Sequence, residues 1–146
     1  MTGGTITING GTVTATSGWG AGIGGGRGDI TRHGGIITIN GGTVTASSSF
    51  GASIGGGQLL TNRQDECDNG ADVTISGGIV IATGDSGIGR GQNGYSFHVP
   101  GKPGTFNTTA DGNAVIFTSS IHDQSNKSNW RASSSRATLA RSTAAP

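Results

Sequence analysis

Residues 4–26 read GTITINGGTVTATSGWGAGIGGG, and residues 35–57 read GIITINGGTVTASSSFGASIGGG. The second stretch repeats the first at a constant offset of 31 residues. A third copy, DVTISGGIVIATGDSGIGRG at 72–91, follows after an insertion of five residues and contains a deletion of two residues. Internal repetition with a period of about 20–50 residues is typical of solenoids, propellers and repeat arrays.

Each copy contains three short extended segments separated by turns, and apolar residues alternate with polar ones inside each segment. Such alternation places one set of side chains on one face of a strand. Aligning the copies puts alanine or a β-branched residue at every inward position. The predicted inward columns are Ile6, Ile37 and Val73; Ile8, Ile39 and Ile75; Val13, Val44 and Val80; Ala15, Ala46 and Ala82; and Ile23, Ile54 and Ile88.

Three strands per copy, each paired with its equivalent one coil away, predict an all-β fold, a right-handed parallel β-helix of about three coils. A propeller blade fits less well, because it needs about four antiparallel strands. A Gly-Gly pair follows the first strand of each copy, where positive φ is easily adopted only by glycine. The residue before each pair, Asn9, Asn40 or Ser76, is expected to stack with its equivalents as a polar ladder.

The composition excludes several other classes of protein. Glycine, serine and threonine together supply 65 of the 146 residues, and 14 isoleucines stand against three leucines, which disfavours a helical bundle. No apolar run approaches the ~20 residues of a membrane span, and the chain shows no signal peptide. The single cysteine, Cys67, cannot form an internal disulfide and therefore says nothing about the redox compartment.

The predicted organisation is a β-helix over 3–98, with coils at about 4–34, 35–71 and 72–98. A linker rich in proline and glycine is expected at 99–111, then a short C-terminal β module at 112–130 and a disordered tail at 131–146. Ile79 and Ile81 replace outward threonines of the earlier coils, so we expect the apolar strand at 114–117 to pack against the third coil.

The ITINGGTVTAT…GAGIGGG units resemble the glycine-rich repeats of large bacterial surface and secreted proteins. DVTISGGIVIATGDSGIG also resembles the coils of a carbohydrate-binding β-helix family that is related in fold to pectate lyases. GNAVIFTSSIHDQSNKSNW at 112–130 resembles the module that follows such repeats. The resemblance covers roughly residues 3–130. It implies an extracellular or cell-surface location, polysaccharide or a surface glycan as partner, and membership of a longer repeat array.

The tail departs from this family, in which the tryptophan is followed by a strand of the form GVIFEGDTGKVYG. Here RASSSRATLARSTA follows Trp130. One permitted coding of this tail spells GVIFEGDTGKVYG when it is read two bases later. We therefore expect a frameshift near Trp130. The excess positive charge of 119–146 would then have no role in binding nucleic acid, and we expect neither a nucleic-acid partner nor membrane insertion.

Three short motifs are better explained as coil structure. Residues 20–25 and 89–94 match G-x-G-x-x-G, but no helical pattern follows either match, as a dinucleotide site requires. Residues 84–87 imitate the nucleophile loop of chymotrypsin-like proteases, yet Ser86 aligns with Ala52 and no histidine is marked as its base. The tripeptide at 27–29, RGD, does not recur in the next coil.

Acidic residues gather in and after the insertion that precedes the third coil. Calcium takes six to eight oxygen ligands, and loops supply them through clustered carboxylates. The candidate ligands are Asp65, Glu66, Asp68, Asp72 and Asp85. Their spacing matches neither an EF-hand nor a nonapeptide calcium roll, so a solvated acidic loop is the alternative, and no other cofactor is indicated.

Two aromatic residues, Trp19 and Phe50, occupy the same loop region of the first and second copies. A flat exposed ring can cover the apolar face of a sugar, which makes this pair the candidate carbohydrate contact. The alternative is that the rings cap the corner over Ile23 and Ile54.

These observations favour a non-catalytic structural or adhesive surface module that binds carbohydrate. A polysaccharide lyase or hydrolase on a similar β-helix is a second hypothesis, for which Arg63 and Arg90 would be the bases near the acidic loop. Ice binding by ranks of Thr-x-Thr is a third hypothesis. Isoleucine replaces threonine in these ranks at Ile36, Ile79 and Ile81, so ice binding is the least favoured of the three hypotheses.

Overall fold

The structure, a computed structural model, describes residues 3–28, 33–60, 70–91, 104–108, 114–119 and 138–141. These residues form ten strands, without a helix among them. The strands are β1 (Thr5–Ile8), β2 (Thr12–Ser17), β3 (Ile23–Gly24), β4 (Ile36–Ile39), β5 (Thr43–Gly55), β6 (Asp72–Ile75), β7 (Ile79–Gly89), β8 (Phe106–Thr108), β9 (Val115–Thr118) and β10 (Thr138–Arg141).

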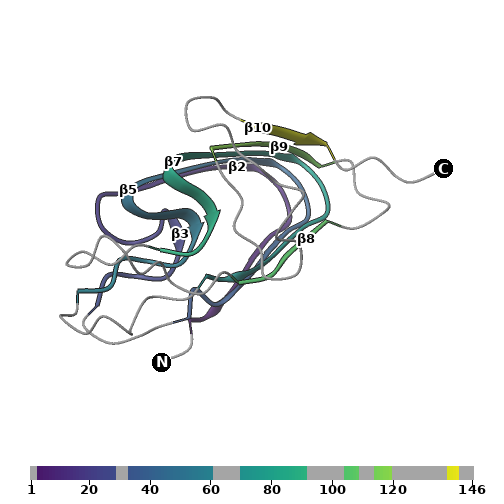
Figure 1. The fold of residues 1–146 in the computed structure, drawn as a ribbon. Helices are drawn as coiled ribbons and strands as arrows, with labels where there is room; N and C mark the ends of the chain where they lie inside the picture. The colour runs from purple at the N-terminus through teal and green to yellow at the C-terminus, as the bar shows by residue number, and fades with distance from the viewer. Residues whose placement is uncertain are drawn as a thin grey trace.

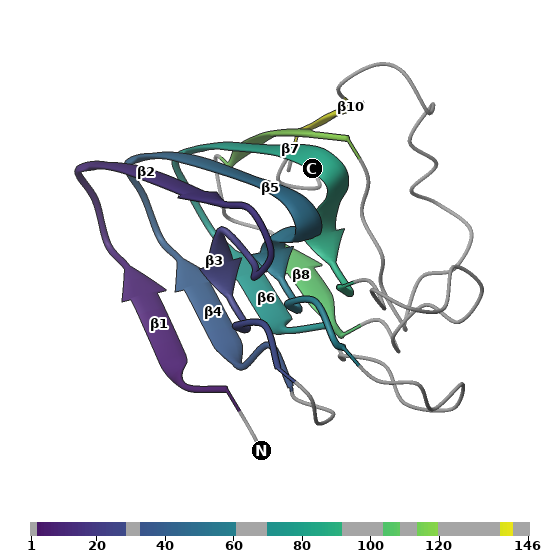
Figure 2. The same ribbon diagram turned by 90° about the vertical axis from the view of Figure 1, so that its left-hand side faces the viewer.

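The first face of the molecule is a parallel sheet in the order β1-β4-β6-β8. Figure 2 shows these strands side by side, each one coil further along the axis. Residue 6 pairs with residue 37, and residue 37 pairs with residue 73, so the register follows the sequence repeat. The two inward columns predicted for this face are confirmed.

The second and third faces share their long strands. β2, the first part of β5, the first part of β7 and β9 form the second face, all in parallel. β5 and β7 then turn a corner and continue onto the third face, where β3 pairs with the end of β5. Viewed nearly along the axis, the coils lie one behind another (Figure 1). The chain is therefore a parallel β-helix, as the repeat predicts.

The core fills the space between the three faces. All five predicted inward columns contribute to it, and their members in the second and third coils are fully buried. Burial of these β-branched residues is the main stabilising term, at roughly 25 cal/mol per Å² of apolar surface. In the first coil, Ile6, Ile8, Val13 and Ala15 are only partly buried, because no described coil covers them on one side.

The predicted polar ladder is present at the corner after the first strand of each coil. Asn40 Nδ2 donates to Asn9 Oδ1 at 2.8 Å, and Ser76 Oγ donates to Asn40 Oδ1 at 2.8 Å. The second glycine of each pair that follows has positive φ, at Gly11, Gly42 and Gly78. Both features of this corner are therefore confirmed.

The C-terminal strands differ from the prediction. Residues 106–108 lie in the predicted linker, yet they form β8 and pair in parallel with β6. The predicted apolar strand does pack against the third coil, as β9, but it continues the parallel stack instead of starting a separate module. Phe106 is buried and pairs with Val73, so it continues the inward column of Val73 although the segment lacks the glycine-rich motif.

The tail also differs from the prediction at four residues. Residues 138–141, inside the segment expected to be disordered, form β10, which pairs antiparallel with β9. The part of the chain that the structure describes contains no helix of the length and apolarity needed to cross a membrane.

Candidate functional site

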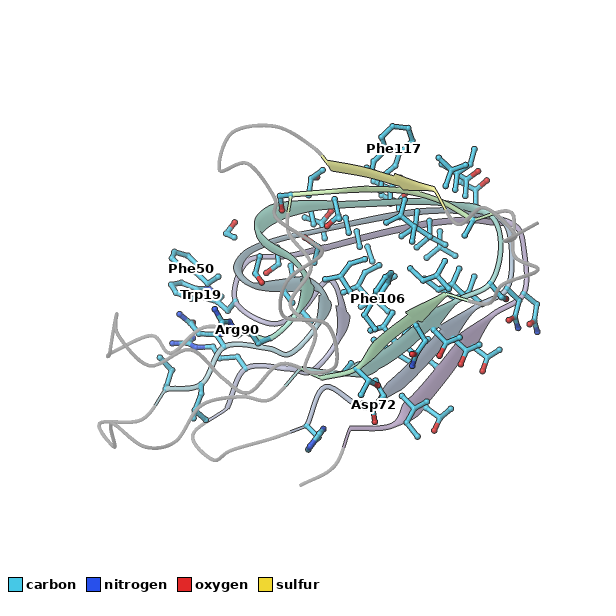
Figure 3. The ribbon with its side chains drawn as sticks, turned by 45° about the vertical axis from the view of Figure 1, so that its right-hand side comes forward. Trp19, Phe50, Asp72, Arg90, Phe106 and Phe117 are labelled. Atoms are coloured by element: carbon cyan, nitrogen blue, oxygen red, sulfur yellow. The ribbon has the colours of Figure 1, made fainter. Side chains whose placement is uncertain are left out.

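The two candidate aromatic residues stack on one another. Trp19 follows β2 in the first coil, and Phe50 occupies the middle of β5, where the chain turns from the second face to the third. Their ring centroids are 4.6 Å apart and their planes differ by 11°. The residues are separated by 31 positions, the offset of the repeat, so stacking of the coils brings the rings together (Figure 3).

Hydrogen bonds fix the backbone that supports these rings. Ser48 Oγ donates to the carbonyl oxygen of Gly20 at 2.7 Å and accepts from the amide of Gly51 at 2.9 Å. This serine therefore joins the Phe50 segment to the Trp19 segment of the previous coil. Gly51 has no room for a side chain, since a Cβ there would lie 2.6 Å from the carbonyl carbon of Gly20. The rings thus project from two closely packed backbones.

Arg27 completes the arrangement. Its guanidinium carbon lies over the Trp19 ring, 4.6 Å from the centroid, within the range of a cation–π contact. In the sequence, Arg27 stands out only as part of the RGD tripeptide, whose Asp29 lies outside the described residues. No sequence motif predicts the contact, because it depends on how the loop after β3 folds back on the indole. We call Trp19, Phe50 and Arg27 the aromatic stack.

The aromatic stack faces solvent. Trp19 is 48% exposed and Phe50 is 40% exposed, whereas the core residues near this corner, Ile23 and Ile54, are buried. The rings therefore present surface outward. A ligand contact requires exposed ring surface of this kind, and the covered part of each residue is compatible with a cap over Ile23 and Ile54.

The acidic candidates are not brought together within the described residues. Asp65, Glu66 and Asp68 lie outside them. Asp72 begins β6 on the first face, and its Oδ1 accepts from Thr105 Oγ1 at 2.8 Å and from the Thr105 amide at 3.2 Å. Asp85 lies in β7 at the corner between the second and third faces, and its side chain is not described.

Asp72 and Asp85 therefore belong to different corners of the coil. Among the described residues, no group of three or more histidine, cysteine, aspartate or glutamate side chains could hold a metal ion. The calcium hypothesis thus depends on the three acidic residues of the 61–69 segment and stays a prediction.

Ser86 and the glycine motifs take part in the coil. Ser86 is buried, pairs in register with Ala52, and donates through Oγ to the carbonyl oxygen of Arg90 at 2.9 Å. Gly24, inside the first G-x-G-x-x-G match, has φ of 132° and lies against Gly55 in the next coil. These residues form strand and corner backbone. Of the histidines, only His33 lies within the described residues; His98 and His122 do not.

One buried polar group was not found from the sequence. Gln58 is only 3% exposed, and it is the residue one repeat offset beyond Arg27. Its Oε1 is the buried side-chain polar atom within the described part of the chain that has no hydrogen-bond partner. Equivalent positions of the repeat thus hold Arg27, which contacts an aromatic ring, in the first coil and Gln58, which has a buried amide, in the second.

The comparison with protein families agrees with the fold. Residues 6–27, 37–58 and 73–89 match a family model described as a beta helix repeat. Each match covers one copy of the sequence repeat and the three faces of its coil. No curated protein and no solved structure is similar enough to this chain to count as a match.

Proposed function

We propose that this β-helix repeat protein is a non-catalytic structural and adhesive module of a bacterial surface or secreted protein, and that it binds carbohydrate at the aromatic stack. The observation that carries the proposal is the pair of stacked, solvent-exposed rings on a corner of the coil. A pyranose ring has a face of C–H groups, which packs well against a flat aromatic ring. Large apolar rings otherwise tend to be buried in a folded protein.

Preorganisation supports the same proposal. The rings stand on backbone segments joined by the Ser48 hydrogen bonds, and β5 pairs with β7 on both sides of the register shift between Ser48 and Ala52. A ligand would therefore meet a platform that is already ordered. Ordering a mobile side chain on binding costs about 0.5–1.5 kcal/mol, so a fixed platform favours binding.

Within the described residues, neither alternative has an equivalent feature. A lyase or hydrolase needs convergent acidic and basic groups, and Asp72 and Asp85 lie at different corners of the coil, while the other acidic candidates and Arg63 lie outside the described residues. Ice binding needs a regular outward rank, but the second face changes from Thr43 and Thr45 to Ile79 and Ile81 at the third coil. We therefore favour carbohydrate binding over both alternatives.

Affinity electrophoresis in gels containing soluble β-glucan, galactan, xylan or arabinogalactan tests the proposal. We expect at least one of these polysaccharides to retard the wild-type protein, and the Phe50→Ala variant to lose that retardation. Ile36→Ala is the matched control, because Ile36 is also an exposed apolar residue but lies on the first face. Equal retardation of all three proteins would contradict a role for the aromatic stack.

A further inference from the structure

The aromatic stack ends at Phe50 because the third coil is shorter at this corner. Ser48 pairs with Gly84 and Ala52 pairs with Ser86, so three residues of the second coil, 49–51, face a single residue, Asp85. The third coil therefore has no third aromatic residue at the equivalent position. At this corner, three residues of the second coil around Phe50 therefore lie opposite one residue of the third coil.

The two rings differ in what already contacts them. The Trp19 ring is stacked on Phe50 and also lies under the guanidinium of Arg27. Phe50 stacks on Trp19, and among the described residues no second ring or cation is stacked on it. Figure 3 shows the Phe50 ring lying on the Trp19 ring at this corner. The exposed surface of Phe50 therefore belongs to the ring edge and to the face turned away from Trp19.

We infer that one pyranose ring binds on the side of Phe50 that faces the third coil, and that Trp19 is a positioning residue that holds Phe50 without contacting the sugar. The inference rests on the proposed function and deepens it. The ligand class is a saccharide that presents the C–H face of a single pyranose, because among the described residues one ring face of the stack has no ring or cation on it. Arg27 holds the indole from its own side and so contributes to the position of Phe50.

Stacking explains why Phe50 needs such support. An exposed phenylalanine without a packing partner samples several rotamers, and binding would have to select one of them. Contact with a parallel indole 4.6 Å away favours a single orientation, and an aromatic pair contributes about 0.5–1.5 kcal/mol beyond its buried area. Loss of the indole should therefore weaken binding less than loss of Phe50 itself.

The test measures the affinity of the full chain for the same four polysaccharides and monitors Trp19 by fluorescence. The chain has two tryptophans, so a Trp130→Phe background makes Trp19 the sole indole. We expect Phe50→Ala and Phe50→Leu to weaken binding about tenfold or more, Trp19→Ala to weaken it about three- to fivefold, and Trp19→Phe to restore it. Saccharide binding should leave the quenching of Trp19 by acrylamide unchanged.

Each other outcome has a distinct meaning. If none of the four polysaccharides retards the protein, the proposed function is wrong, and this inference is wrong with it. Binding that survives in both Phe50 variants, or that protects Trp19 from acrylamide, places the sugar on the indole and overturns only the inference. If the Trp19→Ala variant binds the polysaccharide with wild-type affinity, Trp19 does not position Phe50 for binding. Circular dichroism melts of each variant establish that the fold is kept, and Phe50→Leu retains apolar bulk in case Phe50→Ala unfolds.

Discussion

The first and second coils have almost the same sequence, yet they differ in burial. Ile37 and Ile39 are fully buried in the second coil, whereas Ile6 and Ile8, their equivalents in the first, are only partly buried. The second coil has a described neighbour on both sides, through β1 and β6, and the first has one on a single side. In a solenoid, a residue's contribution to stability therefore depends on its neighbouring coils as well as on its own sequence.

The largest expected effect compares the same truncation in the two coils. Ile39→Ala removes a fully buried side chain and should lower the free energy of unfolding by about 2–5 kcal/mol. Ile8→Ala removes the equivalent, partly buried side chain and should cost about 1 kcal/mol. Urea unfolding followed by circular dichroism measures both values. Equal losses would show that the first coil is covered as fully as the second.

The next comparison uses glycines with the same backbone conformation. Gly11 and Gly42 have φ of 80° and 88°, so alanine is strained at both. A Cβ on Gly11 meets nothing within 4 Å, but a Cβ on Gly42 would collide with the carbonyl oxygen of Gly11. Gly11→Ala should cost about 1–2 kcal/mol from strain alone, and Gly42→Ala about 3 kcal/mol or more. If thermal melts gave the same midpoint for both variants, crowding between coils would not contribute to the loss of stability.

The polar ladder offers a smaller contrast. Among the described residues, Asn40 makes two side-chain hydrogen bonds, one to each neighbouring coil, whereas Asn9 makes one. At about 0.5–1 kcal/mol for each exposed bond, Asn40→Ala should lose roughly twice as much stability as Asn9→Ala. Chemical denaturation of the two variants measures the ratio. A larger loss for Asn9→Ala would contradict the ladder.

The smallest expected effect concerns the outer surface. Ile79 is 43% exposed on the second face and pairs in register with Thr43 of the previous coil. Ile79→Thr should therefore change the free energy of unfolding by less than about 0.5 kcal/mol. The reciprocal variant, Thr43→Ile, is the matched control. A loss above about 1 kcal/mol for Ile79→Thr would mean that another part of the chain packs on this isoleucine.

The repeat in the sequence was sufficient to predict most of the fold. In a parallel sheet in register, equivalent residues of successive copies lie on top of each other, so the inward columns and the Asn9–Asn40–Ser76 ladder follow from alignment alone. The C-terminal strands could not be found in this way. Val73 and Phe106 are 33 residues apart, but Val80 and Ile116 are 36 apart. No constant offset therefore relates β8 and β9 to the third coil.

The candidate site, like the fold, could be predicted from the sequence only in part. The sequence by itself determined that Trp19 and Phe50 occur at the same place in neighbouring copies, because the offset of the repeat separates them. Only the tertiary structure decided that the rings stack, that Arg27 lies over the indole, and that residues 49–51 lie opposite a single residue of the shorter third coil. The physical reason is that the period of a repeat fixes which residues are neighbours. The orientation of a side chain, by contrast, depends on loops and deletions whose paths no period describes.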